Sequence, residues 1–164
     1  MWSSVDTIAI DRVDGVDDSS IVTIRNASPE VVAALVDFDP MAQAGDAQRR
    51  ADIEAWVSAG FTLVAVSGTE VVGYVSTLPA HLLDRDFVGL LIVHPDHRRR
   101  GVGTALLAGA VERAASDRVF TSTNTSNAAM KALLASSGWM KSGTLDGFDQ
   151  GDPEEFYFID RMKG

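Results

Sequence analysis

Three arginines and two glycines stand together near the middle of the chain, in the order Arg98-Arg99-Arg100-Gly101-Val102-Gly103. An apolar run at 87–93 precedes them and predicts a strand, and the pattern after them predicts a helix over 102–115. The first amides of a helix have no partner inside it, and the helix dipole adds positive charge there. Because glycine has no Cβ, an anion can approach the backbone closely. The segment therefore predicts a binding site for a phosphate or pyrophosphate group.

Two common phosphate-binding motifs do not fit this segment. A P-loop requires a Gly-Lys pair, which the chain lacks. A dinucleotide-binding loop of the G-x-G-x-x-G/A type requires a small residue where this chain has Leu106. A dinucleotide-binding protein is therefore a disfavoured alternative, which a fluorescence titration with NADH would test.

Two further groups of residues have chemical potential. His94 and His97 have the H-x-x-H spacing of some zinc sites, but Pro95 opposes a regular helix that would present both rings, so we predict no metal site. Five acids crowd the stretch 146–155, and we interpret them as a solvated hairpin turn, with recognition of a cationic substrate as the alternative. These acids are Asp146, Asp149, Asp152, Glu154 and Glu155.

The elements that must position these residues follow from local patterns. Runs of β-branched and apolar residues predict strands at 7–10, 21–25, 61–66, 71–77, 87–93, 119–123, 139–145 and 155–159. Capping residues before apolar stripes predict helices that begin at Ser28 and that cover 46–59, 102–115 and 127–137. The run 87–93 is nearly all apolar, which predicts a central strand buried on both faces. Hairpins mixed with βαβ units indicate an α/β fold with a mixed sheet and helices on its faces.

Composition sets limits on the class of protein. The chain has 164 residues and a net charge of −9, which indicates one domain over 21–164 after an acidic leader at 1–20. An acidic chain is a poor general binder of nucleic acid. No apolar run approaches the roughly 18 residues of a membrane helix, no signal-peptide pattern is present, and cysteine is absent. We expect a cytoplasmic protein that binds neither nucleic acid nor membrane.

The same residues resemble a known family. V-x-P at 93–95 followed by R-x-x-G-x-G at 98–103 is similar to the acetyl-CoA-binding motif of the GNAT N-acetyltransferases, [Q/R]-x-x-G-x-[G/A]. Downstream, N-x-x-M at 127–130, Leu134 and G-W at 138–139 resemble the second motif of that family, N-x-x-A-x-x-x-Y-x-x-x-G-[F/Y/W]. The resemblance extends over about 21–159 and implies a mixed, mostly antiparallel twisted sheet with helices on both faces.

The resemblance also implies roles for individual residues. Backbone groups of Leu91 and Val93 would pair with the pantetheine arm of acetyl-CoA, and the Leu91 amide would donate to the thioester oxygen as an oxyanion contact. Amides of the arginine-glycine segment would hold the pyrophosphate, and Asn127 would bond to the cofactor near its pantetheine. The implied cofactor-binding residues are Leu91, Val93, Arg98, Arg99, Arg100, Gly101, Val102, Gly103, Thr104 and Asn127.

The chain departs from the family at the acid and leaves the base open. Leu134 stands where many members have a tyrosine that protonates the leaving thiolate, and leucine cannot do so. Asp86 lies at the start of the predicted central strand, where many relatives place an acid, so we assign it as the candidate general base beside the catalytic Leu91 amide. Asp84 is the alternate, and a plain solvated role fits both acids equally well.

The predicted function is an N-acetyltransferase that transfers an acetyl group from acetyl-CoA to a primary amine of a small cationic molecule by direct attack in a ternary complex. A protein or peptide amine is the alternative acceptor, and a GNAT-like module that binds acyl-CoA with little turnover is the alternative function. The cosubstrate is acetyl-CoA, no metal is expected, and the resemblance makes a homodimer an expectation. The sequence names neither the acceptor nor the preferred acyl length.

Overall fold

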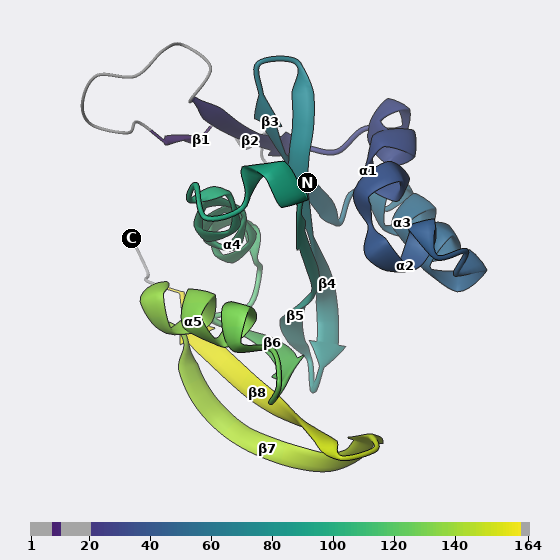
Figure 1. Ribbon diagram of the computed structural model, residues 1–164. Coiled ribbons are helices and arrows are strands. Elements are labelled where there is room, and N and C mark those ends of the chain that lie inside the picture. The colour runs from purple at the N-terminus through teal and green to yellow at the C-terminus, as the bar shows by residue number, and fades with distance from the viewer. Residues whose placement is uncertain (1–7, 11–20, 162–164) are drawn as a thin grey trace. The chain divides into compact units, whose positions relative to one another are not determined.

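The computed structural model describes residues 8–10 and 21–161. Their contacts divide them into two units, which we call unit 1 (the described residues up to 76, with 90–109) and unit 2 (77–89, with 110–161). Three elements belong partly to each unit (Figure 1): β4 (Glu70–Leu82), β5 (Arg85–Val93) and α4 (Val102–Arg113). Apart from 8–10, the predicted acidic leader at 1–20 lies outside the described residues, so the predicted domain boundary stays a prediction.

Unit 1 contains an antiparallel sheet in the order β1-β2-β3-β4. The predicted hairpin forms between β3 and β4, with Thr62 opposite Ser76 and a turn in which Gly68 takes a φ of +59°. The predicted short strand near the N-terminus is confirmed and pairs with β2. The remaining strands of this sheet are β1 (Ile8–Ile10), β2 (Val22–Asn26) and β3 (Thr62–Ser67).

Helices cover both faces of the sheet in unit 1. Leu35 and Ile53 pack with Tyr74 of β4 in one apolar core. The neighbouring residue Gly73 faces the opposite way, against Val102 and Leu106 of α4. The helices on the Tyr74 side are the 3₁₀ helix η2 (Pro29–Val31), α1 (Val32–Phe38), α2 (Pro40–Gln43) and α3 (Ala47–Ser58).

Caps explain where these helices begin. Asp46 accepts from the Arg49 amide at 3.0 Å and starts α3, as the sequence predicts. The helix α2, which the local pattern did not predict, is a single turn that Asp39 caps by accepting from the amides of Met41 and Ala42 at 3.0 and 2.9 Å. The Asp39-Pro40 pair carries the local signal for this turn, because proline suits the first helical position. In the part of the chain that the structure describes, no helix is long and apolar enough to cross a membrane.

Unit 2 is built on strands in the order β5-β6-β8-β7. β5 and β6 run parallel, whereas β8 is antiparallel to both β6 and β7. One face is covered by α5, with Leu134 fully buried and Tyr157 of β8 nearly so. The elements are β6 (Arg118–Asn124), α5 (Ala128–Ser136), β7 (Met140–Asp149) and β8 (Asp152–Asp160). The predicted mixed, mostly antiparallel sheet with helices on both faces is confirmed.

The prediction that 87–93 is buried on both faces is wrong. In β5 only Asp86 and Val88 are buried, and residues 90–93 are half-buried. The ladder between β5 and β6 extends from Asp86 opposite Val119 to Val88 opposite Thr121, and Leu91 and Val93 have no place in it. The apolar run indicates that these residues favour a β-strand. How much of the strand is buried depends on the strands and helices that pack beside it.

Candidate active site

A short turn of 3₁₀ helix, η3 (Pro95–His97), leads from β5 toward α4. Its entry is fixed by His94, whose amide donates to the carbonyl of Val72 at 2.9 Å. The His94 Nδ1 accepts from the Asp96 amide at 3.2 Å, and the ring packs edge-on against Phe38 with centroids 5.6 Å apart. The start of the segment is therefore tied to β4 and α1.

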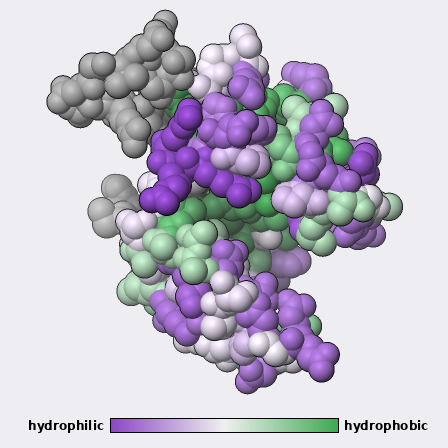
Figure 2. Space-filling view, viewed as in Figure 1, coloured by the Kyte–Doolittle hydropathy of each residue, from purple (hydrophilic) through white to green (hydrophobic). Residues whose placement is uncertain are grey.

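The three predicted arginines lie exposed on this segment. Figure 2 shows a strongly hydrophilic patch over the part of the chain that leads into α4. Arg98 turns back toward the strand, because its Nε donates to the carbonyl of Val93 at 3.2 Å. Three adjacent cations make this patch locally positive in a chain of net charge −9, so it attracts anions.

The backbone at the start of α4 has the geometry of an anion site. Arg99 and Gly101 have φ values of +60° and +82°, and this left-handed turn leads directly into the helix. The Ala105 amide donates to the Gly101 carbonyl at 3.0 Å, so the amides of 102–104 precede the first bond of the helix. A Cβ on Gly101 would meet no atom within 4 Å. Position 101 therefore requires glycine because of its left-handed backbone conformation, not because space is lacking.

Gly73 of β4 fixes where α4 lies on the sheet. A Cβ placed there would come within 3.0 Å of the Ile92 carbonyl oxygen, 3.1 Å of Leu106 Cδ1 and 3.2 Å of Val102 Cγ1. Both helix residues are buried. The missing side chain therefore lets the first turns of α4 approach the strands closely, which places the arginine-glycine segment at the end of β5.

Asp86 lies in unit 2, at the start of β5, with 4% of its surface exposed. Its carboxylate accepts from the amides of Ala115 (2.6 Å), Ala80 (3.2 Å) and Ser116 (3.2 Å). Its own amide donates to the Ser116 hydroxyl at 2.9 Å. These contacts join β5 to the end of β4 and to the connection after α4. A carboxylate engaged in this way has little capacity left to accept a proton from a substrate.

Residues 30–139 match the sequence model of the acetyltransferase (GNAT) family, which is about two-thirds of the chain. The chain belongs to this family.

Individual proteins similar to this GNAT chain include a mycothiol acetyltransferase of Kineococcus radiotolerans, 40% identical over 74 residues, or 44% of this chain and 24% of that protein. The chain spans no more than about a quarter of the curated relatives it matches. A GNAT-family acetyltransferase of Bacillus cereus is 26% identical, with a TM-score of 0.80, over 87% of this chain and 99% of that structure. A Salmonella typhimurium structure solved with its cofactor acetyl-CoA is 23% identical, with a TM-score of 0.69, over 87% of this chain and 95% of that one.

The second GNAT motif lies on α5, in unit 2. Asn127 is the N-cap, because its side-chain oxygen accepts from the Met130 amide at 3.1 Å. Leu134, at the position of the family tyrosine, is fully buried in the core of unit 2. Its carbonyl accepts from the Trp139 amide at 3.0 Å, which closes the end of the helix. Leu134 therefore packs in the core.

The histidines of this GNAT chain make local contacts. His94 and His97 pack edge to face with ring centroids 5.7 Å apart, and His97 Nε2 lies 3.6 Å from a Glu70 carboxylate oxygen. Within residues 8–10 and 21–161, no group of three or more histidine or acidic side chains is placed to hold a metal ion.

Three of the five clustered acids are engaged inside unit 2. Asp152 accepts from the Ser126 amide and hydroxyl at 3.0 and 2.6 Å, and Asp149 accepts from the Asn124 side chain at 2.7 Å. Glu155 is buried, and its carboxylate accepts from the Tyr157 hydroxyl at 2.6 Å. That hydrogen bond, followed by one from Lys141, lowers the pKa of Glu155 to about 2. The stretch is a hairpin, as the sequence predicts, but the prediction that its acids are solvated is wrong for Glu155, which is buried.

Unit 1 contains a buried polar pair that no local sequence pattern predicts. The Tyr74 hydroxyl donates to the Asp39 carboxylate at 2.7 Å, and both residues are fully buried. Burial, followed by this hydrogen bond, raises the pKa of Tyr74 above its usual range. The Arg49 guanidinium approaches the same carboxylate at 3.8 Å. Because 35 positions separate Asp39 from Tyr74, no local pattern signals the contact.

Proposed function

We propose that this chain is an N-acetyltransferase that uses acetyl-CoA to acetylate a primary amine. The observation that carries the proposal is the start of α4, where exposed arginines stand beside amides that precede the first helical hydrogen bond. Helix N-termini of this kind bind phosphate groups. Family membership and the acetyl-CoA found in the Salmonella structure support the same ligand.

The residues present fit this cosubstrate. The amides of Val102, Gly103 and Thr104 would hold the pyrophosphate, with the Arg99 and Arg100 side chains adding charge. Residues Leu91 and Val93 lie beyond the end of the β5–β6 ladder, and an extended arm can bind such a strand edge through backbone hydrogen bonds. Asn127 is proposed to contribute from the start of α5.

The chemistry follows from a thioester that acetyl-CoA supplies when bound: the amine nitrogen bonds to the acetyl carbon, CoA leaves as a thiol, and the amine loses a proton. The proposed role of the Leu91 amide is to donate to the oxygen on which negative charge develops. The three amides that donate to the Asp86 carboxylate favour a role in holding β5 in position over a role as general base. Leu134 supplies no proton, so departure of the thiolate relies on its own acidity or on solvent.

We propose a small-molecule acceptor. The relative from Kineococcus is named for mycothiol, which supports a small molecule over a protein. The internal engagement of Asp149, Asp152 and Glu155 weakens the argument that the acidic stretch selects a cation.

The test is a calorimetric titration of acetyl-CoA into the purified chain and into an Arg100→Glu, Gly103→Asp variant. We expect micromolar binding by the wild type and a loss of affinity of tenfold or more, about 1.4 kcal/mol, in the variant. An aspartate in the first turn of a helix is favourable, so the variant should fold. Arg25→Glu, an exposed change on β2, is the matched control and should bind normally.

Absence of acetyl-CoA binding by the wild type would overturn the proposal. With binding established, release of CoA in the presence of amino acids, diamines and a peptide with a free N-terminus would separate small acceptors from peptides. Binding without release for any amine would favour the alternative of a non-catalytic acyl-CoA-binding module.

A further inference from the structure

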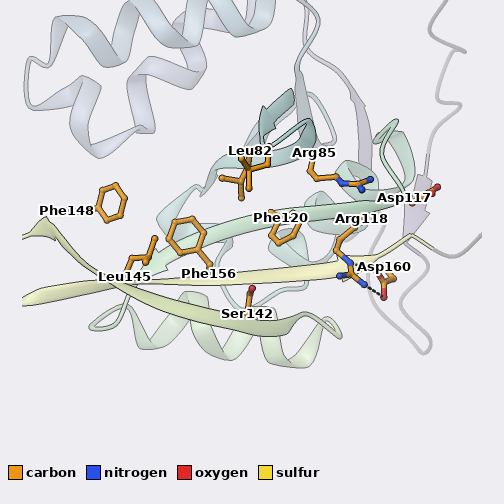
Figure 3. Close-up of a pocket in the computed structure, with 11 residues that line it drawn as sticks. Leu82, Arg85, Asp117, Arg118, Phe120, Ser142, Leu145, Phe148, Phe156 and Asp160 are labelled. Carbon is orange, nitrogen blue, oxygen red and sulfur yellow. Dashed lines mark hydrogen bonds and ion pairs between the residues drawn. The ribbon is translucent and has the colours of Figure 1, made fainter.

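Unit 2 carries a pocket of about 710 Å³ on the face of its sheet opposite α5. Figure 3 shows its two ends: Leu145, Phe148 and Phe156 gather at one, and charged side chains gather at the other. Phe120 and Leu82 lie between them. The pocket is therefore amphipathic along its length.

The alternation of β6 explains why this face is open. Val119, Thr121 and Thr123 are buried, whereas Phe120 on the other face is half-buried. Phe148 is 65% exposed and Leu145 is 52% exposed. Large apolar side chains grouped on an open face are typical of a surface that contacts something else.

The turn between β4 and β5 adds an unusual rim to the pocket. Leu83 and Asp84 have φ values of +47° and +63°, which residues other than glycine adopt at a cost. Leu83 is 90% exposed there and lines the pocket with Leu82. The fold thus holds an apolar side chain over the pocket, although a glycine or asparagine would suit the turn better.

One guanidinium at the polar end, that of Arg85, forms no ion pair with another described residue. Arg118 and Asp160 neutralise each other through hydrogen bonds of 2.6 and 3.2 Å, and the Arg118 guanidinium lies 4.3 Å from the centre of the Phe158 ring. Asp117, at the same end, has a partner of its own. Among the described residues, no carboxylate lies within 4.0 Å of the exposed Arg85 guanidinium. Arg85 is therefore free to bind an anion.

We propose that this pocket binds a small organic carboxylate with an apolar or aromatic body, with the carboxylate on Arg85 and the body against Phe120, Phe148 and Phe156. The volume lies within the range of about 300–1,000 Å³ typical of small-molecule sites. A guanidinium recognises a carboxylate well, and aromatic walls recognise an apolar body. The proposal does not depend on acetyl-CoA binding, because every residue it uses lies in unit 2.

The test compares two probes with the same body and opposite charge, 4-phenylbutyrate and 4-phenylbutylamine. Each is titrated into the ¹⁵N-labelled chain, and amide shifts are followed by NMR. We expect the carboxylate to bind several-fold more tightly than the amine and to shift amides of β6 and β8 around Phe120 and Phe156. The mapped shifts separate this pocket from the arginine-glycine segment.

Two variants separate the charge from the apolar contact. Arg85→Gln should remove the preference for the carboxylate, and Phe148→Ser should weaken both probes. Arg25→Gln is the matched control and should leave binding unchanged. Acetyl-CoA affinity should be unaltered in Arg85→Gln, which keeps the outcome distinct from the test of the proposed function.

Equal binding of the two probes, or shifts confined to residues outside the pocket, would overturn the proposal. An apolar face can also be covered by a second copy of the chain, and sedimentation of the wild type and of Phe148→Ser tests this. If the wild type self-associates through this face and excludes 4-phenylbutyrate, the surface is an interface between copies of this chain, and the proposal is wrong.

Discussion

Two buried carboxylates of unit 2 show how the partners of a single residue determine its role. Among the described residues, the Asp86 carboxylate accepts only from backbone amides, which belong to segments that meet at the start of β5. Glu155 accepts from the Tyr157 hydroxyl and the Lys141 ammonium, and Lys131 lies 3.7 Å away. The first arrangement favours a positioning residue, and the second favours a carboxylate that stays ionised at low pH.

Asp86→Asn tests whether that residue positions β5 or acts as the base. The amide replaces an acceptor with a donor facing backbone N–H groups, so we expect a loss of about 1–3 kcal/mol of stability in urea unfolding. The pH profile of kcat/KM should keep its shape. Asp84→Asn, an exposed change in the same hairpin, is the control and should not destabilise. A stable Asp86→Asn protein whose rate falls by about 10²–10⁴ would instead identify Asp86 as the base.

The Glu155 carboxylate makes the free energy of unfolding depend on pH in the acidic range. Its pKa is about 2 when folded, against an ordinary value of 4.5, so the unfolded chain takes up the proton first. The stabilisation is complete above pH 4.5 and is lost as the pH falls toward 2. In urea unfolding between pH 6 and 2.5, the wild type should lose more stability than Glu155→Gln. Glu154→Gln is the neighbouring control, and an acid dependence shared by all three proteins would contradict the assignment.

At the scale of elements, the contact between α4 and β4 places the proposed phosphate site. That contact requires Gly73, because a Cβ there would come within 3.0 Å of the Ile92 carbonyl and also meet the side chains of α4. The Ile92 carbonyl is part of the β5 backbone and moves aside less easily than the side-chain ends of Val102 and Leu106. A Cβ at position 73 therefore pushes β5 and the first turns of α4 away from β4 by a few tenths of an ångström.

Gly73→Ala should therefore destabilise the chain by about 1–3 kcal/mol and weaken acetyl-CoA binding, because the start of α4 is displaced. Thermal unfolding and calorimetric titration measure the two effects. Gly143→Ala is the matched control in another strand, since a Cβ there meets nothing within 4 Å. Equal effects of the two substitutions would show that the close approach at Gly73 has no energetic weight.

At the scale of the whole molecule, charge and connectivity matter most. The net charge is −9, yet Arg98, Arg99 and Arg100 are adjacent and exposed, so local positive potential exists in an acidic protein. The implied cofactor-binding residues are distributed between the units: Leu91 and the arginine-glycine segment belong to unit 1, and Asn127 belongs to unit 2. The elements β4, β5 and α4 each continue from one unit into the other.

Much of this organisation can be predicted from the sequence, because the patterns that indicate each element are local. Caps at Asp46 and Asn127, the hairpin around Gly68 and the arginine-glycine segment before α4 each depend on a few neighbouring residues. Capping, turn and periodicity rules act over that range. The resemblance to the GNAT family depends on the same short motifs, and the family match confirms it.

The amino-acid sequence by itself predicted the order of elements apart from α2, the family, and the phosphate site that we propose at residues 98–104. Only the tertiary structure decided that β8 lies between β6 and β7, that Asp86 is enclosed by amides from two other segments, and that Asp39 meets Tyr74. It also decided that Phe120, Phe148 and Phe156 line one pocket. The physical reason is range: such contacts join residues tens of positions apart, and long-range packing sets them where local propensity has no information.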